Sequence, residues 1–378
     1  MKYSIEIGKI VEGAIKKDTA KVRSYVEQLI KKLDEEGENI SADKFRKMLS
    51  LSPVVALSSF GHDANPVPVD NESRMPLVDL TFPGENDGSV FLSKSNMFQV
   101  NEFIENYRCS DKLSREGLEI GNTLILYGPP GCGKTKTARM ISKELGLPLV
   151  TARLDGLISS YLGTTAKNMR RIFEYVQRMP CVLLLDEFDA IAKARDDGNE
   201  LGELKRVVNS LLQNIDNVGK ECLIIAATNH EQLLDNAVWR RFSYKLKIEP
   251  PDTEAIGQMI KELIGNRLAL SNAELEQISA CFYGKSGATI EETVNKAMRS
   301  AVFKNEVLSK KHIYNQLLSS VDLSGSIRTG EFQLERINYF ISKNTPERKY
   351  FTYENIGEIL GLTKGYISIL LKEGKKDD

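Results

Sequence analysis

One eight-residue stretch, GPPGCGKT at 128–135, constrains the fold of this chain more than any other. It follows the apolar run TLILY (123–127), whose length and aliphatic content predict a buried strand. Apolar residues then recur at helical spacing through Ala138, Ile141 and Leu145, which predicts a helix after the loop. A strand, a glycine-rich loop and a helix in this order bind phosphate groups through backbone N–H groups at the helix N-terminus. The stretch therefore predicts a site for a nucleoside triphosphate.

The residues of this loop each have an expected part in the site. Lys134 would reach the β and γ phosphates, and the Thr135 hydroxyl would ligate Mg²⁺. The expected ligands are therefore ATP and Mg²⁺. The rest of the expected cofactor site comprises Gly128, Pro129, Pro130, Gly131, Cys132, Gly133 and Lys136.

Composition excludes several other classes of protein. The 378 residues carry 51 Lys and Arg against 52 Asp and Glu, so no global charge draws the chain to nucleic acid or membrane. Its five cysteines are odd in number and widely spaced, which is typical of reduced thiols and unlike a zinc site. No apolar run approaches membrane-spanning length. Charged residues interrupt the N-terminal segment every few positions, so it lacks the continuous apolar region of a signal peptide. We therefore expect a cytoplasmic protein that does not contact a membrane.

Strand-like and helical patterns alternate between residues 91 and 250, the order that builds a mostly parallel sheet covered by helices. The predicted fold class is therefore α/β. The runs predicted as strands are TLILY (123–127), LPLVTAR (147–153), CVLLLDEFD (181–189), CLIIAATN (222–229) and YKLKIEP (244–250). The expected domains are a helical N-terminal region at 1–50, a proline-rich linker at 51–90, the P-loop α/β domain at 91–250, a helical subdomain at 251–322 and a helical tail at 326–378.

Two acids follow the apolar residues of the third predicted strand. Ligands of open α/β sheets gather at the carboxyl ends of strands, so Asp186 would hold Mg²⁺ together with Thr135. Glu187 could accept a proton from a water molecule that attacks the γ phosphate. Phosphoryl transfer to another molecule needs no such base at this position, so the pair favours ATP hydrolysis over kinase activity. The alternative is a strand that ends in solvated acids.

Polar residues further along complete the expected catalytic set. Asn229 ends the next predicted strand, where its amide could orient the attacking water, although a lone Asn there is usually a turn residue. Arg240 and Arg241 follow a short helical pattern, and such a pair in isolation is usually a surface charge. Their order and spacing after Asn229 carry a resemblance to a known family.

The chain resembles the AAA ATPases, in particular the classical clade of hexameric remodelling motors. The matching motifs are GPPGCGKT (128–135), LLLDEFDAI (183–191), AATN (226–229), LDNAVWRRF (234–242) and GKSGATI (284–290). The resemblance implies a P-loop AAA+ domain with a helical lid, in a homohexameric ring with ATP between subunits. It implies that Arg240 and Arg241 act as arginine fingers on the neighbour's γ phosphate. It also puts Gly287 and Ala288 in the cofactor site.

The same resemblance implies a loop that grips polypeptide in the central channel of the ring. Tyr161, Leu162 and Gly163 match its aromatic-hydrophobic-glycine pattern, whereas Ser160 and Thr164 depart from the basic and acidic residues common in relatives. The alternative is a tyrosine packed beneath the loop. The chain has no HExxH or GxSxG motif, so an unfoldase of this kind would need a separate protease for any degradation. The N-terminal helices would select the polypeptide client.

The tail raises a second function. TYENIGEILGLTKGYISILLKEG (352–374) resembles a helix-turn-helix, with the turn at Gly361. The residues expected to face outward are Thr363, Lys364, Tyr366 and Ser368. Residues 326–378 carry nine Lys and Arg against eight Asp and Glu, a weak charge for a DNA-binding domain. Polypeptide is therefore the favoured partner, and the alternative is a nucleic-acid-directed ATPase, a DNA-binding regulator or mobile-element ATPase.

Overall fold

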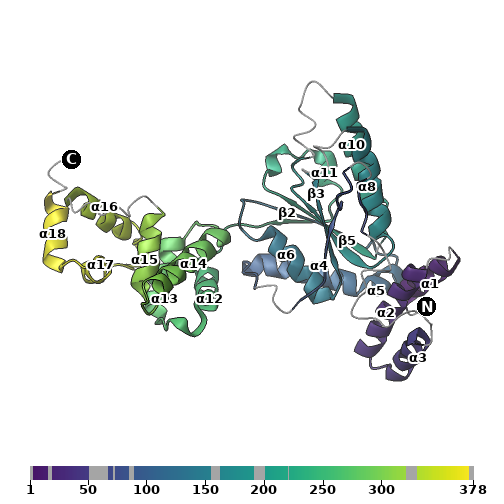
Figure 1. The fold of residues 1–378 in the computed structure, drawn as a ribbon, viewed down its shortest axis with the longest axis horizontal. Coiled ribbons are helices and arrows are strands. Elements are labelled where there is room, and N and C mark those ends of the chain that lie inside the picture. The colour runs from purple at the N-terminus through teal and green to yellow at the C-terminus, as the bar shows by residue number, and fades with distance from the viewer. Residues whose placement is uncertain are drawn as a thin grey trace. The chain divides into compact units, whose positions relative to one another are not determined.

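A computed structural model describes residues 3–15, 19–50, 67–70, 73–84, 89–154, 162–190, 201–219, 221–320 and 330–373 (Figure 1). The chain divides into two compact units, each with its own hydrophobic core. The first unit comprises Met1–Val90, Lys94–Gly128 and Lys134–Ile248. The second comprises Phe91–Ser93, the loop segment Pro129–Gly133 and Glu249–Asp378.

The first unit is built on one six-stranded sheet with the strand order β1-β3-β4-β5-β2-β6. Figure 1 labels three of its strands, β2, β3 and β5. β1 pairs antiparallel with β3, and every other pair is parallel. All five strands predicted from apolar runs are present, and the α/β fold class is confirmed. The strands are β1 (Asp79–Thr81), β2 (Thr123–Tyr127), β3 (Leu149–Arg153), β4 (Cys181–Asp186), β5 (Cys222–Thr228) and β6 (Tyr244–Lys247).

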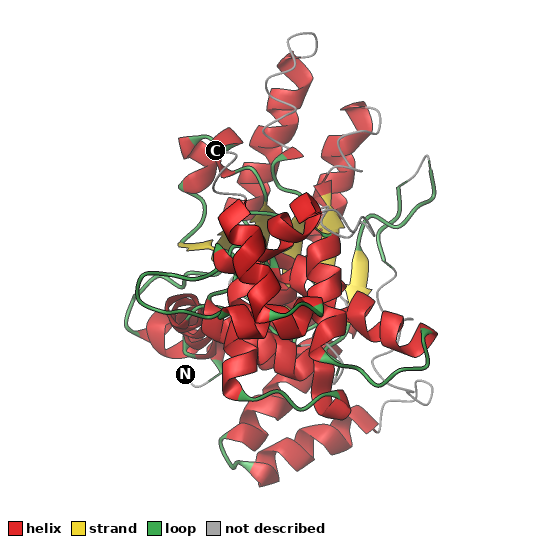
Figure 2. Cartoon of the chain, turned by 90° about the vertical axis from the view of Figure 1, so that its left-hand side faces the viewer, coloured by secondary structure: helices red, strands yellow, loops and turns green. Residues whose placement is uncertain are grey.

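Helices bury both faces of the sheet, which explains why its central strands are apolar without interruption. On β4, Leu183 and Leu185 belong to the core formed with α8 and α10. α6 packs on β3, β4 and β5, and α4 packs on α6. Helices make up most of the described chain (Figure 2). Those of this part of the chain are α4 (Lys94–Arg108), α5 (Ser110–Arg115), α6 (Lys134–Leu145), α8 (Leu162–Val176), α10 (Leu201–Asp216), η1 (Glu231–Leu233) and α11 (Asn236–Trp239).

Three N-terminal helices form a small bundle within the first unit: α1 (Ser4–Ile15), α2 (Thr19–Glu35) and α3 (Asn39–Ser50). Leu29 and Leu33 of α2 are buried in its core together with Ala42 of α3.

β1 lies within the segment 51–90, which the sequence analysis interprets as a linker. Leu77 and Val78 are buried beside it, and Leu80 pairs with Val150 of β3. A three-residue strand is too short to give a periodic signal, and prolines on both sides of it suggested irregular structure. Part of this segment therefore belongs to the edge of the sheet.

From Thr253 on, helices are the only regular secondary structure among the described residues of the second unit. α13 begins with a capping box between Ser271 and Glu274, and hydrogen bonds from Ser271, then from Lys310, lower the pKa of Glu274 to about 2. None of the helices that the structure describes is long and apolar enough to cross a membrane. The elements are α12 (Thr253–Ile264), η2 (Gly265–Arg267), α13 (Asn272–Phe282), α14 (Gly287–Phe303), α15 (Lys310–Ser319), α16 (Gly330–Ile341), α17 (Tyr353–Leu360) and α18 (Lys364–Glu373).

Candidate nucleotide site

The glycine loop begins where β2 ends beside the continuation of β6. Gly128 has a φ of +133°, a conformation that L side chains rarely adopt. A Cβ on Gly128 would also stand 2.2 Å from the carbonyl oxygen of Ile248, so only glycine fits. This close approach fixes the direction in which the chain leaves the sheet.

Lys134 and Thr135 open α6 directly after the loop. Lys134 is only 7% exposed, and its Nζ donates a hydrogen bond to the carbonyl oxygen of Gly128 at 2.8 Å. The Thr135 Oγ1 donates to Oδ2 of Asp186 at 3.2 Å. The two predicted Mg²⁺ ligands thus lie side by side, as a hydroxyl and a carboxylate that share one hard cation would need to. These residues fit the predicted ion.

Glu187 follows Asp186 at the carboxyl end of β4 and is exposed. Its φ of +54° is unusual for a residue other than glycine and costs about 1–2 kcal/mol. Two hydrogen bonds hold this backbone: the Glu187 N–H donates to Oδ1 of Asp186 at 2.9 Å, and the Phe188 N–H to the Ala227 carbonyl at 2.9 Å. Left-handed residues that the surroundings force into place cluster at functional sites, where they aim a side chain.

β5 lies between β4 and β2, so Asn229 follows a strand that ends beside both the acids and the glycine loop.

A buried hydrogen bond that the sequence does not predict joins the end of β5 to the turn after β4. The Thr228 hydroxyl donates to Oδ1 of Asp189 at 3.2 Å and accepts from the His230 N–H at 3.1 Å. Asp189 is 5% exposed and ties the turn after β4 to the end of β5. Its only sequence signal is the second aspartate of DEFD (186–189).

The two arginines predicted as a pair have different surroundings. Arg240 is exposed, and its side chain makes no hydrogen bond or ion pair with a residue that the structure describes. Arg241 is held inside its own chain: its Nε lies 3.3 Å from Oδ2 of Asp216, and its Nη1 donates to the Ala237 carbonyl at 3.2 Å. Trp239, just before them, packs edge-on against Tyr127 at 5.1 Å between ring centroids.

Within the second unit, the middle of the glycine loop lies against the start of α14. The Ala288 N–H donates to the Gly131 carbonyl at 2.9 Å. A side chain on Gly131 would meet Ser286 Oγ at 2.9 Å and the Ala288 Cβ at 3.0 Å. A Cβ on Gly287 would stand 3.5 Å from the same carbonyl. The structure therefore brings the small pair Gly287 and Ala288 to the phosphate loop.

The remaining predicted site residues have simpler surroundings. Gly133 has a φ of +105°, and Cys132 is buried. Pro129, Pro130 and Lys136 are exposed. Tyr161 of the predicted pore loop lies outside the described residues, and Leu162 and Gly163 are the first two residues of α8.

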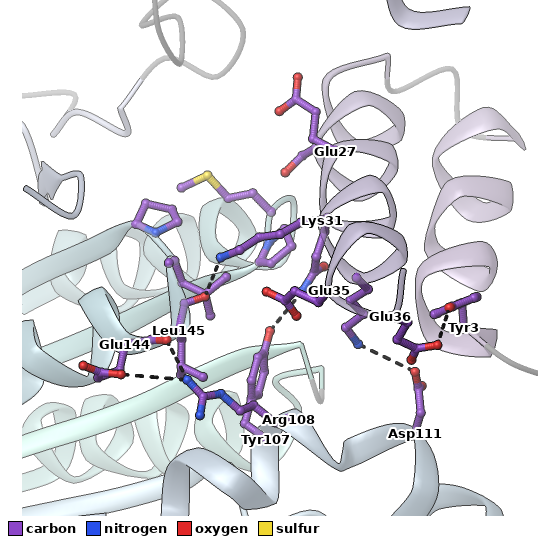
Figure 3. Close-up of a pocket in the computed structure, with 18 of the residues that line it drawn as sticks. Tyr3, Glu27, Lys31, Glu35, Glu36, Tyr107, Arg108, Asp111, Glu144 and Leu145 are labelled. Atoms are coloured by element: carbon purple, nitrogen blue, oxygen red, sulfur yellow. Dashed lines mark hydrogen bonds and ion pairs between the residues drawn. The ribbon is translucent and has the colours of Figure 1, made fainter. Parts of the chain in front are cut away.

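A cavity of about 460 Å³ lies in the first unit between α2, α4, α5 and the end of α6 (Figure 3). Lys31 of α2 donates to the Leu145 carbonyl at 3.3 Å (Figure 3). Lys32 lies 3.6 Å from Asp111. Pro148 and Pro180, which precede β3 and β4, also line it. The cavity is therefore at the amino ends of the strands, opposite the edge that carries Asp186. It is not part of the nucleotide site.

Comparison with known proteins agrees with this geometry. Residues 124–250 match the family "ATPase family associated with various cellular activities (AAA)". The AAA family ATPase y4kL of Sinorhizobium fredii is 37% identical over 297 residues, which cover 78% of this chain and 89% of that protein. The ATP-dependent zinc metalloprotease FtsH of Aster yellows witches'-broom phytoplasma is 27% identical over 288 residues, 74% of this chain but only 40% of the relative. The chain thus spans less than half the length of this relative.

A solved structure shares the fold. The crystal structure of the FIGL-1 AAA domain aligns with a TM-score of 0.54 over 70% of this chain and 90% of that domain, at 20% sequence identity. Together with the y4kL match, the fold and the phosphate loop define the class: the chain belongs to the AAA family of ATPases. It binds and hydrolyses ATP, as the sequence analysis predicts.

Lys134→Ala is expected to weaken ATP binding strongly, because Lys134 is the loop's only cation predicted to reach the β and γ phosphates. Losing charge-assisted hydrogen bonds worth about 3 kcal/mol weakens binding roughly 100-fold. Titration with a fluorescent ATP analogue measures the change. Lys143→Ala, an exposed lysine of the same helix, is the matched control and should bind as the wild type does. Equal affinity of the two variants would contradict the role of Lys134.

Proposed function

We propose that this ATPase assembles into a homohexameric ring and uses ATP hydrolysis to unfold or remodel polypeptide clients. The observation that carries the ring is Arg240. Its guanidinium is exposed and has no polar partner among the described residues, and it follows the end of β5 by 12 residues. Such a side chain is suited to act outside its own subunit. The nucleotide site of one subunit would then be completed by an arginine of its neighbour.

Within one subunit, each residue has a separate task in hydrolysis. Lys134 would bind the β and γ phosphates, and Thr135 and Asp186 would hold Mg²⁺, which neutralises charge on the phosphates when it is bound. Glu187 would take the proton from the attacking water, and Asn229 would orient that water. The fixed backbone around Glu187 keeps this carboxylate at the edge of the sheet without a search through other conformations.

The neighbouring subunit would supply positive charge to the γ phosphate. Arginine fingers raise hydrolysis by roughly 10³–10⁵ in other nucleotide hydrolases. The exposure of Arg240 supports it as the finger. Arg241, which is tied to Asp216, would hold the turn that presents Arg240.

The polypeptide substrate is proposed from two observations. Relatives that match 69–74% of this chain are named as ATP-dependent zinc metalloproteases, FtsH. Tyr161, Leu162 and Gly163 have the aromatic-hydrophobic-glycine pattern expected of a loop that grips a chain in a ring. Clients would pass Tyr161, the N-terminal bundle would select them, and a separate protease would carry out any degradation. The cytoplasm is the proposed location.

The test compares ATP hydrolysis with and without a permanently unfolded protein. For the wild type, we expect the unfolded protein to accelerate hydrolysis. Tyr161→Ala should bring the ratio of stimulated to unstimulated rates towards one, because the grip is lost. Tyr283→Ala, an exposed tyrosine of the lid (70% exposed), is the matched control and should keep the ratio. The proposal would be overturned if duplex DNA accelerated ATP hydrolysis, unfolded protein did not, and Tyr161→Ala left the acceleration by DNA unchanged.

A further inference from the structure

The helices α17 and α18 form a tight helix-turn-helix. α17 begins with a capping box between Thr352 and Asn355 and ends at Gly361, which has the left-handed φ of +71°. Only Gly361, Leu362 and Thr363 separate α17 from α18. A Cβ on Gly357 would stand 2.5 Å from the Leu362 carbonyl oxygen, so the turn folds directly onto α17. This short glycine turn between two helices is the arrangement of the DNA-binding motif.

A shared core holds the two helices at a fixed angle. Ile356 of α17 is fully buried, as is Ile367 of α18. α16 adds Ile337 and Phe340 to the same core, so three helices support one another (Figure 1). A helix-turn-helix supported by a third helix is also found among DNA-binding domains.

The three helices are also fixed to the lid. Tyr314 of α15 stacks edge-on against Phe340 at 5.5 Å and Phe351 at 6.2 Å between ring centroids. The Gln277 side chain donates to the Tyr350 carbonyl at 2.8 Å. Lys310 lies 3.6 Å from Glu358. The motif is therefore part of the second unit's single core and moves with the lid.

The outer face of α18 has the composition of a surface that contacts nucleic acid. Lys364, Gly365 and Tyr366 are exposed at its start, and Ile369 is 52% exposed one turn later. Lys364 is the only charged side chain in the first two turns, so no carboxylate repels a phosphate there. Of the acids on α17 and α18, Glu358 lies 3.6 Å from Lys310, Glu373 stands at the far end of α18, and Glu354 is exposed in the first turn of α17.

Exposed lysines surround this face. Lys349 lies just before α17, and Lys364 and Lys372 stand eight residues apart on α18, which is about 12 Å along a helix. None of the three makes an ion pair with a described residue. Lys349 lies 5.8 Å from the centre of the Tyr353 ring, which positions it at the start of α17. Lys364 and Lys372 therefore stand near the two ends of α18, which a major groove about 12 Å wide can admit.

We propose that this motif binds duplex DNA, with α18 in the major groove. Lys364, Lys349 and Lys372 would contact phosphates on either side. Tyr366, Ser368 and Ile369 would lie against base edges, where hydroxyl and apolar groups contact bases and the thymine methyl. DNA accounts for this face better than a protein partner does. The centre of a protein interface is a broad apolar patch, whereas the exposed apolar side chains of this helix face are only Tyr366 and Ile369. The proposal gives the ATPase a second ligand, independent of the polypeptide client.

The test measures binding of the full chain to a short fluorescein-labelled duplex of random sequence by anisotropy, between about 50 and 200 mM salt. We expect the wild type to bind at the low end of this range, with affinity falling as salt rises. Lys364→Glu should weaken binding at least tenfold. It should also lower the slope of log affinity against log salt concentration by about one or more. This variant keeps the helix, because an acid in the first turn is favoured by the helix dipole. Tyr366→Ala, which adds no charge, should also weaken binding.

Lys304→Glu is the matched control, because Lys304 is exposed at the end of α14 and the charge change is the same. It should bind DNA as the wild type does. Thermal melting verifies that each variant is folded. Absence of binding at about 50 mM salt, where sequence-independent binding is strong, would overturn the proposal. An equal loss of DNA affinity in Lys304→Glu and Lys364→Glu would also overturn it. So would a DNA affinity that neither Tyr366→Ala nor Lys364→Glu changes.

Discussion

Glu187→Gln is expected to leave ATP bound and to slow its hydrolysis by about 10²–10⁴-fold. Glutamine has the shape of glutamate, but its amide cannot take a proton from the attacking water. The backbone at this position is held by Asp186 and the Ala227 carbonyl, so the substitution should not move its neighbours. Nucleotide affinity and single-turnover hydrolysis, measured on the same preparation, separate binding from chemistry.

Glu116→Gln is the control for this change, since it removes an exposed carboxylate from the same unit. It should hydrolyse ATP at the wild-type rate. If Glu187→Gln also did so, the proton acceptor would be another group. Loss of ATP affinity in Glu187→Gln would mean instead that Glu187 supports the nucleotide rather than the chemical step.

Arg240→Ala is expected to reduce hydrolysis by about 10³–10⁵-fold, the effect of an arginine finger. Arg241→Ala should reduce it less, because the Arg241 guanidinium is tied to Asp216 and to the Ala237 carbonyl of its own chain. Its main consequence should be a small loss of stability, within about 1 kcal/mol for a partly exposed ion pair. Hydrolysis rates and melting temperatures of the two variants test this difference. Equal rates in Arg240→Ala and the wild type would exclude the finger.

Mixing two inactive variants tests whether Arg240 acts on a neighbour. An Arg240→Ala subunit keeps Glu187, and a Glu187→Gln subunit keeps Arg240, so an interface between them can have both groups intact. The mixture should therefore hydrolyse ATP faster than either variant alone. Activity that equals the average of the two preparations would indicate that Arg240 acts within its own subunit.

Local patterns made most of the fold predictable. Each central strand is an apolar run bounded by turn residues, and the structure has every one of them. The Thr135–Asp186 pair could also be predicted, because the carboxyl ends of parallel strands meet at one edge. β1 was missed, because its three residues acquire their strand geometry only from the pairing with β3.

Contacts between distant segments could not be predicted in the same way. Asp189 is buried because it accepts a hydrogen bond from Thr228, which lies 39 residues away. Arg240 and Arg241 are equivalent as sequence, and they differ only because Asp216 at the end of α10 lies next to one of them. The packing of Gly131 against Ala288 likewise depends on the lid. Tyr161 remains a prediction from its motif.

The dependence of hydrolysis on subunit concentration tests the shared ATP site most directly. Steady-state ATP turnover per subunit should rise steeply as wild-type protein is concentrated through its assembly range, measured in parallel by light scattering. The rise is expected because each nucleotide lacks its arginine until a neighbour arrives. Lys143→Ala should follow the same curve. Turnover per subunit that stays constant down to concentrations at which light scattering shows only monomers would contradict the account.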